Sequence, residues 1–362
     1  MSQPPHWSRR RFLIAALLAA ACRPERSAPT LYQRGMAQLP TPTPNQVAAL
    51  AATLPPLPVH VPITPLNRLY EKSFRGTPDL SNAAEWSLTL DGLVGNPLQI
   101  SLADLRAMPQ QSAIRTLQCI SNPVGGGLIG TWDWQGVPLA PLLARAAVLP
   151  SARYALFEAA DGYTTSVALE WLTQPDVLLI TGAHGEALPP RHGFPLRILI
   201  PRLYGQKQPK WITRITFAAE DRLGYWEGSG REWSNLAVVK TNSAFRQPAA
   251  NVLPFAAPTY LEGYAFGGGR TIKAVEISAT LANAQGQPLP WQPATLITPP
   301  SPLAWMWWYF LWTPPQAGLY RLAVRATDES GFTQAIFPNS LIGAAFPDGT
   351  DAIHALSVRL RA

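Results

Sequence analysis

The chain has 362 residues, which is more than a typical single domain and enough for two domains with separate cores. Hydrophobic residues make up 47% of it and charged residues only 14%, while its 38 Pro and 13 Trp are high counts. This composition excludes disorder as the main state and favours a β-rich, loop-rich globular protein. The formal net charge is +7, but three arginines lie in an N-terminal leader, which leaves 26 basic against 22 acidic residues, or +4. A small, scattered excess of this kind argues against nucleic acid as a partner.

Residues 1–22 have the pattern of an N-terminal leader. Arg9, Arg10 and Arg11 precede an apolar run, Phe12–Ala21, that would span only ~15 Å as a helix, about half of a bilayer core. The run is therefore interpreted as a signal sequence of the twin-arginine (Tat) type, which directs the export of folded proteins. Cys22 follows small residues, as the acylated cysteine of a lipoprotein does. We expect an exported, periplasmic or otherwise extracytoplasmic protein, with Cys22 as the candidate site of a lipid anchor.

Residues 23–58 are rich in Pro and Ala, which predicts an extended linker. A first domain is expected over residues 59–250. Three of its elements can be predicted: a half-buried strand at Trp86–Gly92, a helix capped at Ser101, and a helix over Val137–Ala147.

The stretch 116–130 holds Cys119 and three successive glycines, residues 125–127. A strand that ends in a glycine-rich turn suits a metal ligand, because glycines let the backbone and a cofactor approach closely. A thiolate prefers soft or thiophilic metals to magnesium or calcium. The alternative is a buried cysteine that acts as a small hydrophobe. Since Cys22 belongs to the leader, Cys119 has no disulfide partner, and a metal would protect a lone thiol in an oxidising compartment.

A second cluster, residues 190–211, carries His192, Arg197, Lys207 and Lys210 around glycine-containing loops. Each of these side chains could be an ordinary surface polar residue. Their grouping, three cations and a histidine, also fits a cradle for a phosphate.

A second domain is expected over residues 251–362. Alternating strands are predicted at Tyr260–Phe266, Ile272–Leu281, Trp305–Trp312 and Gly318–Ala326. Short strands at this spacing favour a β-sandwich of immunoglobulin type. The glycines at 267–269 are not interpreted as a phosphate-binding loop, because no Lys-Ser/Thr pair and no helical pattern follow them.

The molybdenum-ligand segment of the sulfite oxidase family is similar to three motifs of this chain: Leu117-Gln118-Cys119-x-x-Asn122, Gly125-Gly126, and Trp134-x-Gly136-Val137-Pro138-Leu139. The resemblance extends from about residue 60 to the C-terminus. It implies an α+β fold, with a mixed α/β molybdenum-cofactor domain followed by an all-β, immunoglobulin-like domain of the dimerisation type. It also implies a molybdopterin-dependent oxidoreductase in which Cys119 binds the metal of a pyranopterin dithiolene cofactor and takes part in catalysis.

The resemblance assigns roles to further residues. Tyr163, in Asp161-Gly162-Tyr163, would face the metal and donate a hydrogen bond to substrate, and the alternative is an exposed tyrosine in an ordinary turn. The cofactor would be bound by Asn67, Tyr70, Glu71, His192, Arg197, Lys207, Gln208, Pro209 and Lys210.

Departures from the family pattern bear on the substrate. Lys207 stands where sulfite oxidases often carry a substrate-facing arginine, and Lys72 or Ser73 stands near the place of an earlier one. Lysine offers a point charge where arginine offers a two-pronged donor to an oxyanion. The loop from Tyr204 to Lys210 resembles that of periplasmic methionine-sulfoxide reductases of the same superfamily. We expect weak oxidation of sulfite and better reduction of a neutral S-oxide or N-oxide.

The implied reaction is oxygen-atom transfer at molybdenum, to or from a small sulfur oxyanion or an S-oxide or N-oxide. The sequence has no haem-binding Cys-x-x-Cys-His motif. We therefore expect no haem and a separate redox partner, a cytochrome or a quinone-linked protein, together with a homodimer formed through the C-terminal domain. The competing hypothesis is a non-catalytic exported lipoprotein, a binding module with a degenerate molybdenum fold.

Overall fold

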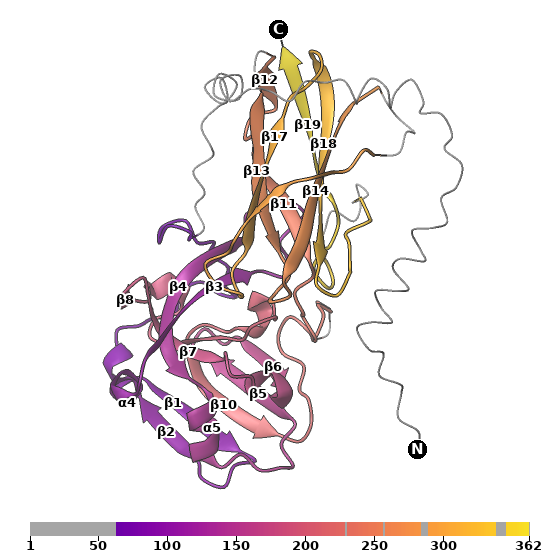
Figure 1. Cartoon of the computed structure of the whole chain (residues 1–362). Coiled ribbons are helices and arrows are strands. Elements are labelled where there is room, and N and C mark those ends of the chain that lie inside the picture. The colour runs from indigo at the N-terminus through magenta and orange to yellow at the C-terminus, as the bar shows by residue number, and fades with distance from the viewer. Residues whose placement is uncertain (1–62, 229, 256–257, 284–288, 338–344, 362) are drawn as a thin grey trace, which may run out of the picture. The chain divides into compact units, whose positions relative to one another are not determined.

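A computed structural model of the chain describes residues 63–228, 230–255, 258–283, 289–337 and 345–361 (Figure 1). The predicted leader with Cys22 and the predicted linker lie outside these residues. No helix within the described residues is both long enough and apolar enough to cross a membrane.

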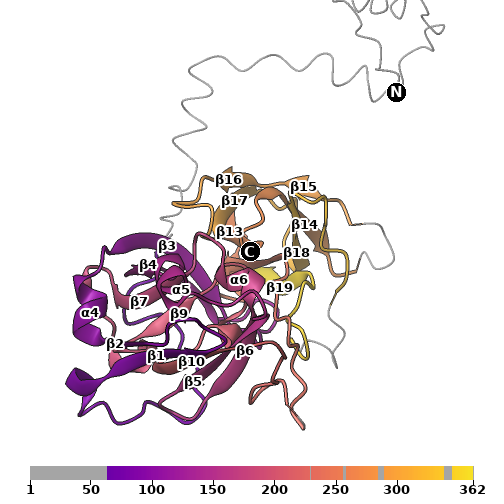
Figure 2. The same ribbon diagram turned by 90° about the horizontal axis from the view of Figure 1, so that it is seen from below.

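The first part of the described chain contains two sheets. One has the strand order β2-β1-β10-β5-β6, and Figure 2 shows these strands side by side. In this sheet β1 and β10 are parallel, while the other neighbours are antiparallel. The bounds are β1 Ser87–Gly92, β2 Leu98–Ser101, β5 Tyr154–Ala159, β6 Thr164–Ala168 and β10 Ile212–Ala218.

The second sheet has the order β3-β4-β7-β8, with β9 also paired to β7, and it is antiparallel throughout. Its strands are β3 Gln111–Gln118, β4 Ile129–Pro138, β7 Leu178–Ala183, β8 Glu186–Ala187 and β9 Arg197–Leu199. Since β3 and β4 form a hairpin, the predicted cysteine loop is the connection between them, residues 119–128.

Short helices join these strands. They are η1 Ala83–Glu85, α4 Leu102–Ala107, α5 Ala140–Ala146, α6 Leu169–Leu172, η2 Pro190–His192 and η3 Gly205–Lys207. The predicted cap of α4 is confirmed: the Ser101 hydroxyl accepts the Asp104 N–H at 3.0 Å, and the Asp104 carboxylate accepts the Ser101 N–H at 3.0 Å.

The helix predicted over Val137–Ala147 begins later than expected. Val137 and Pro138 complete β4, where they pair with the start of β7. α5 therefore begins at Ala140, and the proline in its first turn is Pro141 rather than Pro138.

The C-terminal part is a sandwich of two sheets, drawn from orange to yellow in Figure 1. One sheet has the order β11-β13-β17-β16 and the other β12-β19-β18-β14-β15. The strands are β11 Asn242–Gln247, β12 Val252–Pro254, β13 Thr259–Phe266, β14 Ile272–Leu281, β15 Gln292–Pro293, β16 Thr295–Ile297, β17 Met306–Trp312, β18 Gly318–Asp328 and β19 His354–Arg361. The predicted order, a mixed α/β domain followed by an all-β sandwich, is confirmed. β11 belongs to the sandwich although it precedes residue 251, where we expected the second domain to begin.

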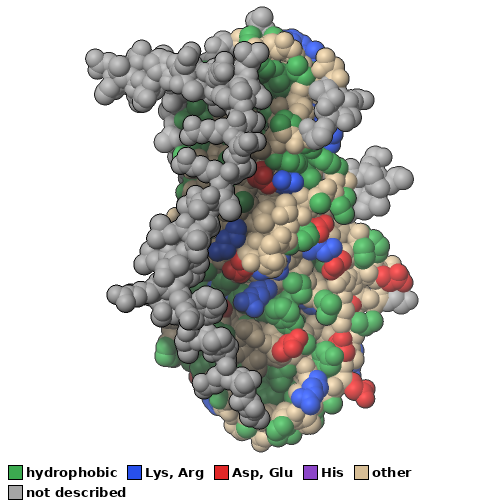
Figure 3. Space-filling view, turned by 45° about the vertical axis from the view of Figure 1, so that its right-hand side comes forward, with side chains coloured by type: hydrophobic (Ala, Val, Ile, Leu, Met, Phe, Trp, Pro, Cys, Tyr) green, Lys and Arg blue, Asp and Glu red, His purple; other side chains and the backbone are tan. Residues whose placement is uncertain are grey.

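Separate hydrophobic clusters stabilise these layers. One contains residues of β1, β10 and α5, including Leu90 and Ile215, and another contains residues of both sandwich sheets, including Trp308 and Leu322. A third cluster joins the two parts of the chain, because it includes Ile120 of the cysteine loop together with sandwich residues. On the face shown in Figure 3, acidic and basic side chains are interspersed among apolar ones.

Candidate active site

Cys119 is the first residue of the tight loop between β3 and β4. Its N–H donates to the carbonyl of Leu128 at 2.9 Å, and the Asn122 side-chain oxygen accepts the N–H of Leu128 at 2.8 Å. Gly125 has φ +72°, a conformation that favours glycine. Within this loop Cys119 is 8% exposed, and its sulfur lies 3.1 Å from the hydroxyl oxygen of Ser121.

Cys119 lines a cavity of about 980 Å³, its open mouth included. Among the predicted site residues, those that line it are Tyr70, Cys119, Tyr163, His192, Arg197, Gln208, Pro209 and Lys210. Those that do not are Asn67, Glu71 and Lys207.

His192, Arg197 and Lys210 form the cationic part of the cavity. η2 is followed by Gly193, where φ is +115° and a Cβ would lie 3.0 Å from the Arg197 Cβ, so glycine allows the close approach. Arg197 begins β9 and donates from Nη1 to the carbonyl of His192 at 3.1 Å. Lys210 donates from Nζ to the carbonyl of Arg191 at 2.8 Å. Backbone carbonyls thus hold both cations at the cavity.

Burial and mutual repulsion lower the pKa values of these groups. Burial, followed by the surrounding positive charges, lowers the pKa of His192 to about 3, so the imidazole is neutral near pH 7. In agreement, its Nε2 accepts the Arg191 Nε–H at 3.2 Å. Burial, followed by the charge of Arg197, lowers the pKa of Lys210 to about 7. A bound anion would oppose these shifts, because it would favour the protonated forms.

Arg197 is buried, at 4% exposure, and within the described residues it forms no ion pair with a carboxylate. Its Nη2 donates to the carbonyl of Gln208 at 3.5 Å, and the guanidinium carbon lies 5.1 Å from the ring centroid of Trp134. Its Nε–H has no acceptor in the part of the chain that the structure describes. Burial lowers the pKa of Arg197 to about 10, which still leaves it charged. A buried cation with an unused donor beside a cavity fits an anionic group bound there.

Tyr163 belongs to an aromatic part of the same cavity, which Phe74, Trp226 and Trp233 also line. Its hydroxyl donates to the carbonyl of Gln206 at 2.7 Å. Burial, followed by a nearby carboxylate, raises the pKa of Tyr163 well above its ordinary value, so the group keeps its proton. Sequence reasoning missed Trp226 and Trp233, because the segment around them lacks any alternating or helical pattern.

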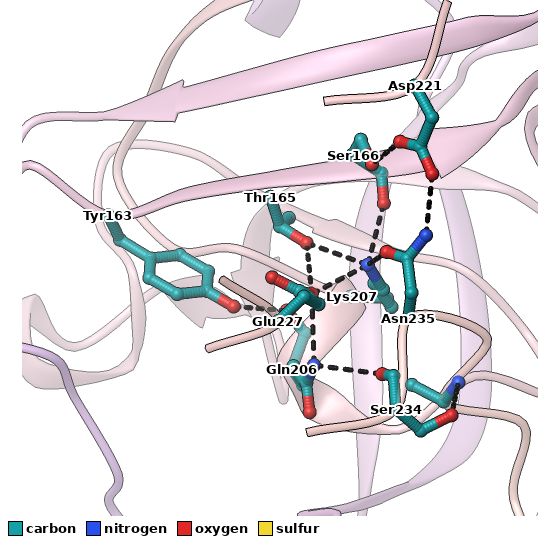
Figure 4. Close-up of polar contacts among 10 residues, drawn as sticks. Tyr163, Thr165, Ser166, Gln206, Lys207, Asp221, Glu227, Ser234 and Asn235 are labelled. Carbon is teal, nitrogen blue, oxygen red and sulfur yellow. Dashed lines mark hydrogen bonds and ion pairs between the residues drawn. The ribbon is translucent and has the colours of Figure 1, made fainter. Parts of the chain in front are cut away.

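Lys207, which we predicted to bind the cofactor, does not line the cavity. Its Nζ pairs with Glu227 at 2.6 Å, and the two side chains are 1% and 0% exposed. The same Nζ donates to the carbonyl of Ser166 at 2.9 Å, to Thr165 Oγ1 at 3.1 Å and to Asn235 Oδ1 at 2.8 Å (Figure 4). Its charge is therefore neutralised and its donors are used inside the protein.

The structure also does not bring Asn67 and Glu71 to the cavity, and both are exposed. The segment is anchored by Leu69, which packs into the core of β3, β4 and β7, and the cavity is reached by Tyr70 and Lys72. Burial raises the pKa of Tyr70 well above its ordinary value, so it too remains protonated.

Known proteins are similar to this chain in sequence and in fold. A family model described as an oxidoreductase molybdopterin binding domain matches residues 75–226. The uncharacterized oxidoreductase YuiH of Bacillus subtilis (strain 168) is 32% identical over 158 residues, which cover 42% of this chain and 75% of that protein. Sulfite oxidase of Arabidopsis thaliana is 29% identical over 268 residues, covering 60% of this chain and 67% of that protein. The crystal structure of the sulfane dehydrogenase SoxCD from Paracoccus pantotrophus has the same fold, with a TM-score of 0.70 at 21% identity over 94% of this chain and 96% of that chain.

Proposed function

This chain belongs to the sulfite oxidase family of molybdopterin-binding oxidoreductases, and we propose that it transfers an oxygen atom to or from a small substrate and prefers an uncharged S-oxide or N-oxide to sulfite. The observation that carries the choice of substrate is the Lys207–Glu227 ion pair, which removes a cation from the cavity wall. A dianion such as sulfite needs that charge more than a neutral oxide does.

The cationic part of the cavity would hold the phosphate of the pyranopterin. Arg197 has an unused Nε–H and no carboxylate partner among the described residues, and Lys210 adds a second charge. His192 is neutral and packs edge-on against Trp132, with ring centroids 4.8 Å apart, so it shapes the site without adding charge. These features fit the cofactor, and Cys119 would bind its metal through the thiolate. The bound molybdenum would supply the two-electron chemistry of oxygen-atom transfer.

The aromatic part would bind the substrate. Tyr163 stays protonated, so it can donate a hydrogen bond to a substrate oxygen by giving up its present bond to the Gln206 carbonyl. Phe74, Trp226 and Trp233 provide apolar surface for a substituent on sulfur or nitrogen. A neutral oxide with an apolar substituent satisfies both features.

Two parallel assays test the substrate class. One follows oxidation of sulfite by an artificial electron acceptor, and the other follows reduction of an alkyl sulfoxide or an amine N-oxide by a reduced dye. We expect a higher kcat/KM for the neutral oxide and a high KM for sulfite, since one missing charged hydrogen bond costs about 1.5–3 kcal/mol, or roughly tenfold or more in binding. Tight and fast sulfite oxidation would refute this choice of substrate.

Metal analysis tests the proposed cofactor and the role of Cys119. We expect about one molybdenum per chain, with pyranopterin released on denaturation, and we expect Cys119→Ser to abolish turnover because an alcohol is a poor substitute for a thiolate ligand. Ser121→Ala is the matched control, since it removes the hydroxyl 3.1 Å from the sulfur but leaves the sulfur in place. A chain purified without molybdenum would instead support the non-catalytic hypothesis. A fully active Cys119→Ser variant would refute the role of Cys119 as the metal ligand.

The export route and the redox partner are further parts of the proposal. The twin arginines and Cys22 support Tat export with a lipid anchor, and electrons would be exchanged with an external cytochrome or quinone-linked protein. Changing Arg9, Arg10 and Arg11 to lysine should leave the folded precursor in the cytosol, and Cys22→Ala should release the mature protein from the membrane. Unimpaired export, or continued membrane attachment, would reject the corresponding step.

A further inference from the structure

The sandwich strand β11 holds the chain on the N-terminal side of Cys119. Asn242, at the start of β11, exchanges side-chain hydrogen bonds with Gln118: Asn242 Nδ2 donates to Gln118 Oε1 at 3.1 Å, and Gln118 Nε2 donates to Asn242 Oδ1 at 3.4 Å. Both side chains are buried. Because Gln118 directly precedes Cys119, the sandwich fixes the residue before the thiol.

Near the end of the same strand, Arg246 holds the far side of the cysteine loop. Its Nη1 donates to the carbonyl of Gly125 at 3.1 Å, and its Nη2 donates to the carbonyl of Gly126 at 3.0 Å. A planar guanidinium on two successive carbonyls is a geometrically specific contact. It restrains a turn of glycines, which have the greatest backbone freedom and no side chains with which to restrain themselves.

A β-bulge directs Arg246 toward the loop. Phe245 and Gln247 pair with consecutive residues of β13, so Arg246 between them has no residue opposite. Bulges of this kind change the direction of a side chain and occur next to active sites. The backbone N–H of Phe245 donates to Nδ1 of His354, on β19, at 3.0 Å. The irregular strand is therefore supported by a side chain from the opposite sheet.

Two other sandwich residues lie against the same turn. A Cβ at Gly125 would be 2.3 Å from Nε2 of His354, so the ring packs directly on the glycine. Burial raises the pKa of Tyr264, while the charge of Arg246 and hydrogen bonds with Asn122 and Arg246 oppose that rise. The Arg246 guanidinium carbon also lies 4.7 Å from the ring centroid of Tyr264, and the Asn122 side chain closes the loop at its other end.

Ile120, the residue after Cys119, is also fixed by the sandwich. It belongs to a buried cluster that contains Tyr264, Phe266 and Trp305. The residues before and after the thiol, and the turn that follows them, all contact the C-terminal part of the chain.

We propose that the sandwich is a positioning element for the thiol, and that Arg246 is the positioning residue that fixes the cysteine loop through the carbonyls of Gly125 and Gly126. Arg246 does not line the cavity, so it acts through the loop and not on a bound molecule. The inference rests on the proposed function in one respect, since it takes Cys119 as the residue that binds the metal.

The test uses full-length, cofactor-free protein carrying Cys22→Ala, in which Cys119 is the only cysteine. The measurement is the rate of alkylation of Cys119 by iodoacetamide at fixed pH, with thermal stability measured alongside. We expect Arg246→Gln to raise the rate about tenfold, equivalent to ~1.4 kcal/mol, because release of the loop exposes a buried thiol. Tyr264→Phe should raise it less, since it removes only one hydroxyl.

Arg325→Gln is the matched control. Arg325 is a partly buried sandwich arginine that pairs with Glu276 at 2.8 Å on the sheet opposite β11, so its removal should leave the alkylation rate unchanged. Rates that are unchanged or slower in both Arg246→Gln and Tyr264→Phe would overturn the proposal, whatever the loss of thermal stability. If Arg246→Gln does not fold, Tyr264→Phe alone decides. No molybdenum enters this assay, so a wild-type protein without molybdenum would refute the proposed function and not this inference.

Discussion

Arg197 and Lys207 are cations in neighbouring segments of the chain, and both are almost inaccessible to solvent, at 4% and 1% exposure. Lys207 meets the carboxylate of Glu227 at 2.6 Å. Arg197 meets only backbone carbonyls and an aromatic ring, and its Nε–H is unused within the described chain.

This difference indicates that the charge of Lys207 has a structural role, whereas the charge of Arg197 is available to bind a ligand. Removing a charge from water is expensive unless a partner of opposite sign compensates for it. For Lys207 the compensation comes from Glu227, whose Oε1 also accepts hydrogen bonds from Thr165 and Gln206 at 2.9 Å each (Figure 4). For Arg197 the compensation has to come from outside the described residues, and the cavity beside it is where an anion can enter.

The largest expected effect is on stability, from Lys207→Met. This change leaves Glu227 buried without its cation, which typically costs about 3–5 kcal/mol. Urea unfolding of the cofactor-free protein measures the loss, and the double change Lys207→Met with Glu227→Leu should recover most of it. A single variant that loses less than about 1 kcal/mol would mean that the pair is not a structural charge.

Arg197→Met is expected to have a smaller effect, which falls on cofactor retention and not on stability. Replacing an unpaired buried cation by an apolar side chain is often neutral or stabilising, so the cofactor-free protein should unfold at the same or a higher urea concentration. Cofactor retention should fall by roughly tenfold or more, because a charged hydrogen bond contributes about 1.5–3 kcal/mol. Molybdenum content after gel filtration measures this. The comparison fails if Arg197→Met and Lys207→Met change stability and retention in the same way.

The smallest effect is a dependence on pH, through Lys210. Because its folded pKa is about 7 and its ordinary value is 10.5, the unfolded chain binds that proton more tightly. The free energy of unfolding of the cofactor-free protein should therefore rise with pH between about 7 and 10.5.

Anion binding should show the opposite trend. Sulfate keeps its charge over this range, so its affinity for the cofactor-free cavity should fall as pH rises above about 7, by at most tenfold per pH unit. Lys210→Arg should remove the dependence, because arginine stays charged, and His192 should contribute nothing, since its pKa is about 3. Titration calorimetry at several pH values measures the sulfate affinity of the wild type and of the Lys210→Arg variant. Identical slopes of affinity against pH in the two proteins would exclude Lys210 as the source.

The layered fold could be predicted because its signals are local. Alternating apolar and polar residues predicted β1, β13, β14, β17 and β18, and the Ser101–Asp104 cap predicted α4. The start of α5 could not be predicted from Val137 and Pro138, because pairing with β7 keeps these residues in β4. That pairing joins distant parts of the chain and leaves no pattern in the local sequence.

The site likewise contains features that the local sequence predicts and features that depend on contacts between distant segments. The cysteine loop and the His192–Lys210 cluster are marked by glycines and clustered cations, and both line the cavity. The pairing of Lys207 with Glu227 could not be foreseen, because Glu227 lies in a separate segment with no recognisable pattern. Arg246 is similar, since its part in the loop depends on a bulge that only the pairing of β11 with β13 reveals.

The cavity is assembled from distant parts of the chain, which sets an order of events during folding. Tyr70, Cys119, Tyr163, Lys210 and Trp233 all line one space, and the loop that carries Cys119 is held by Arg246. Closing such long loops comes late and slowly compared with forming local turns and helices. A nascent chain that ends before Trp233 would lack part of the cavity lining, so a prosthetic group would meet the whole lining only after the first domain has been synthesised.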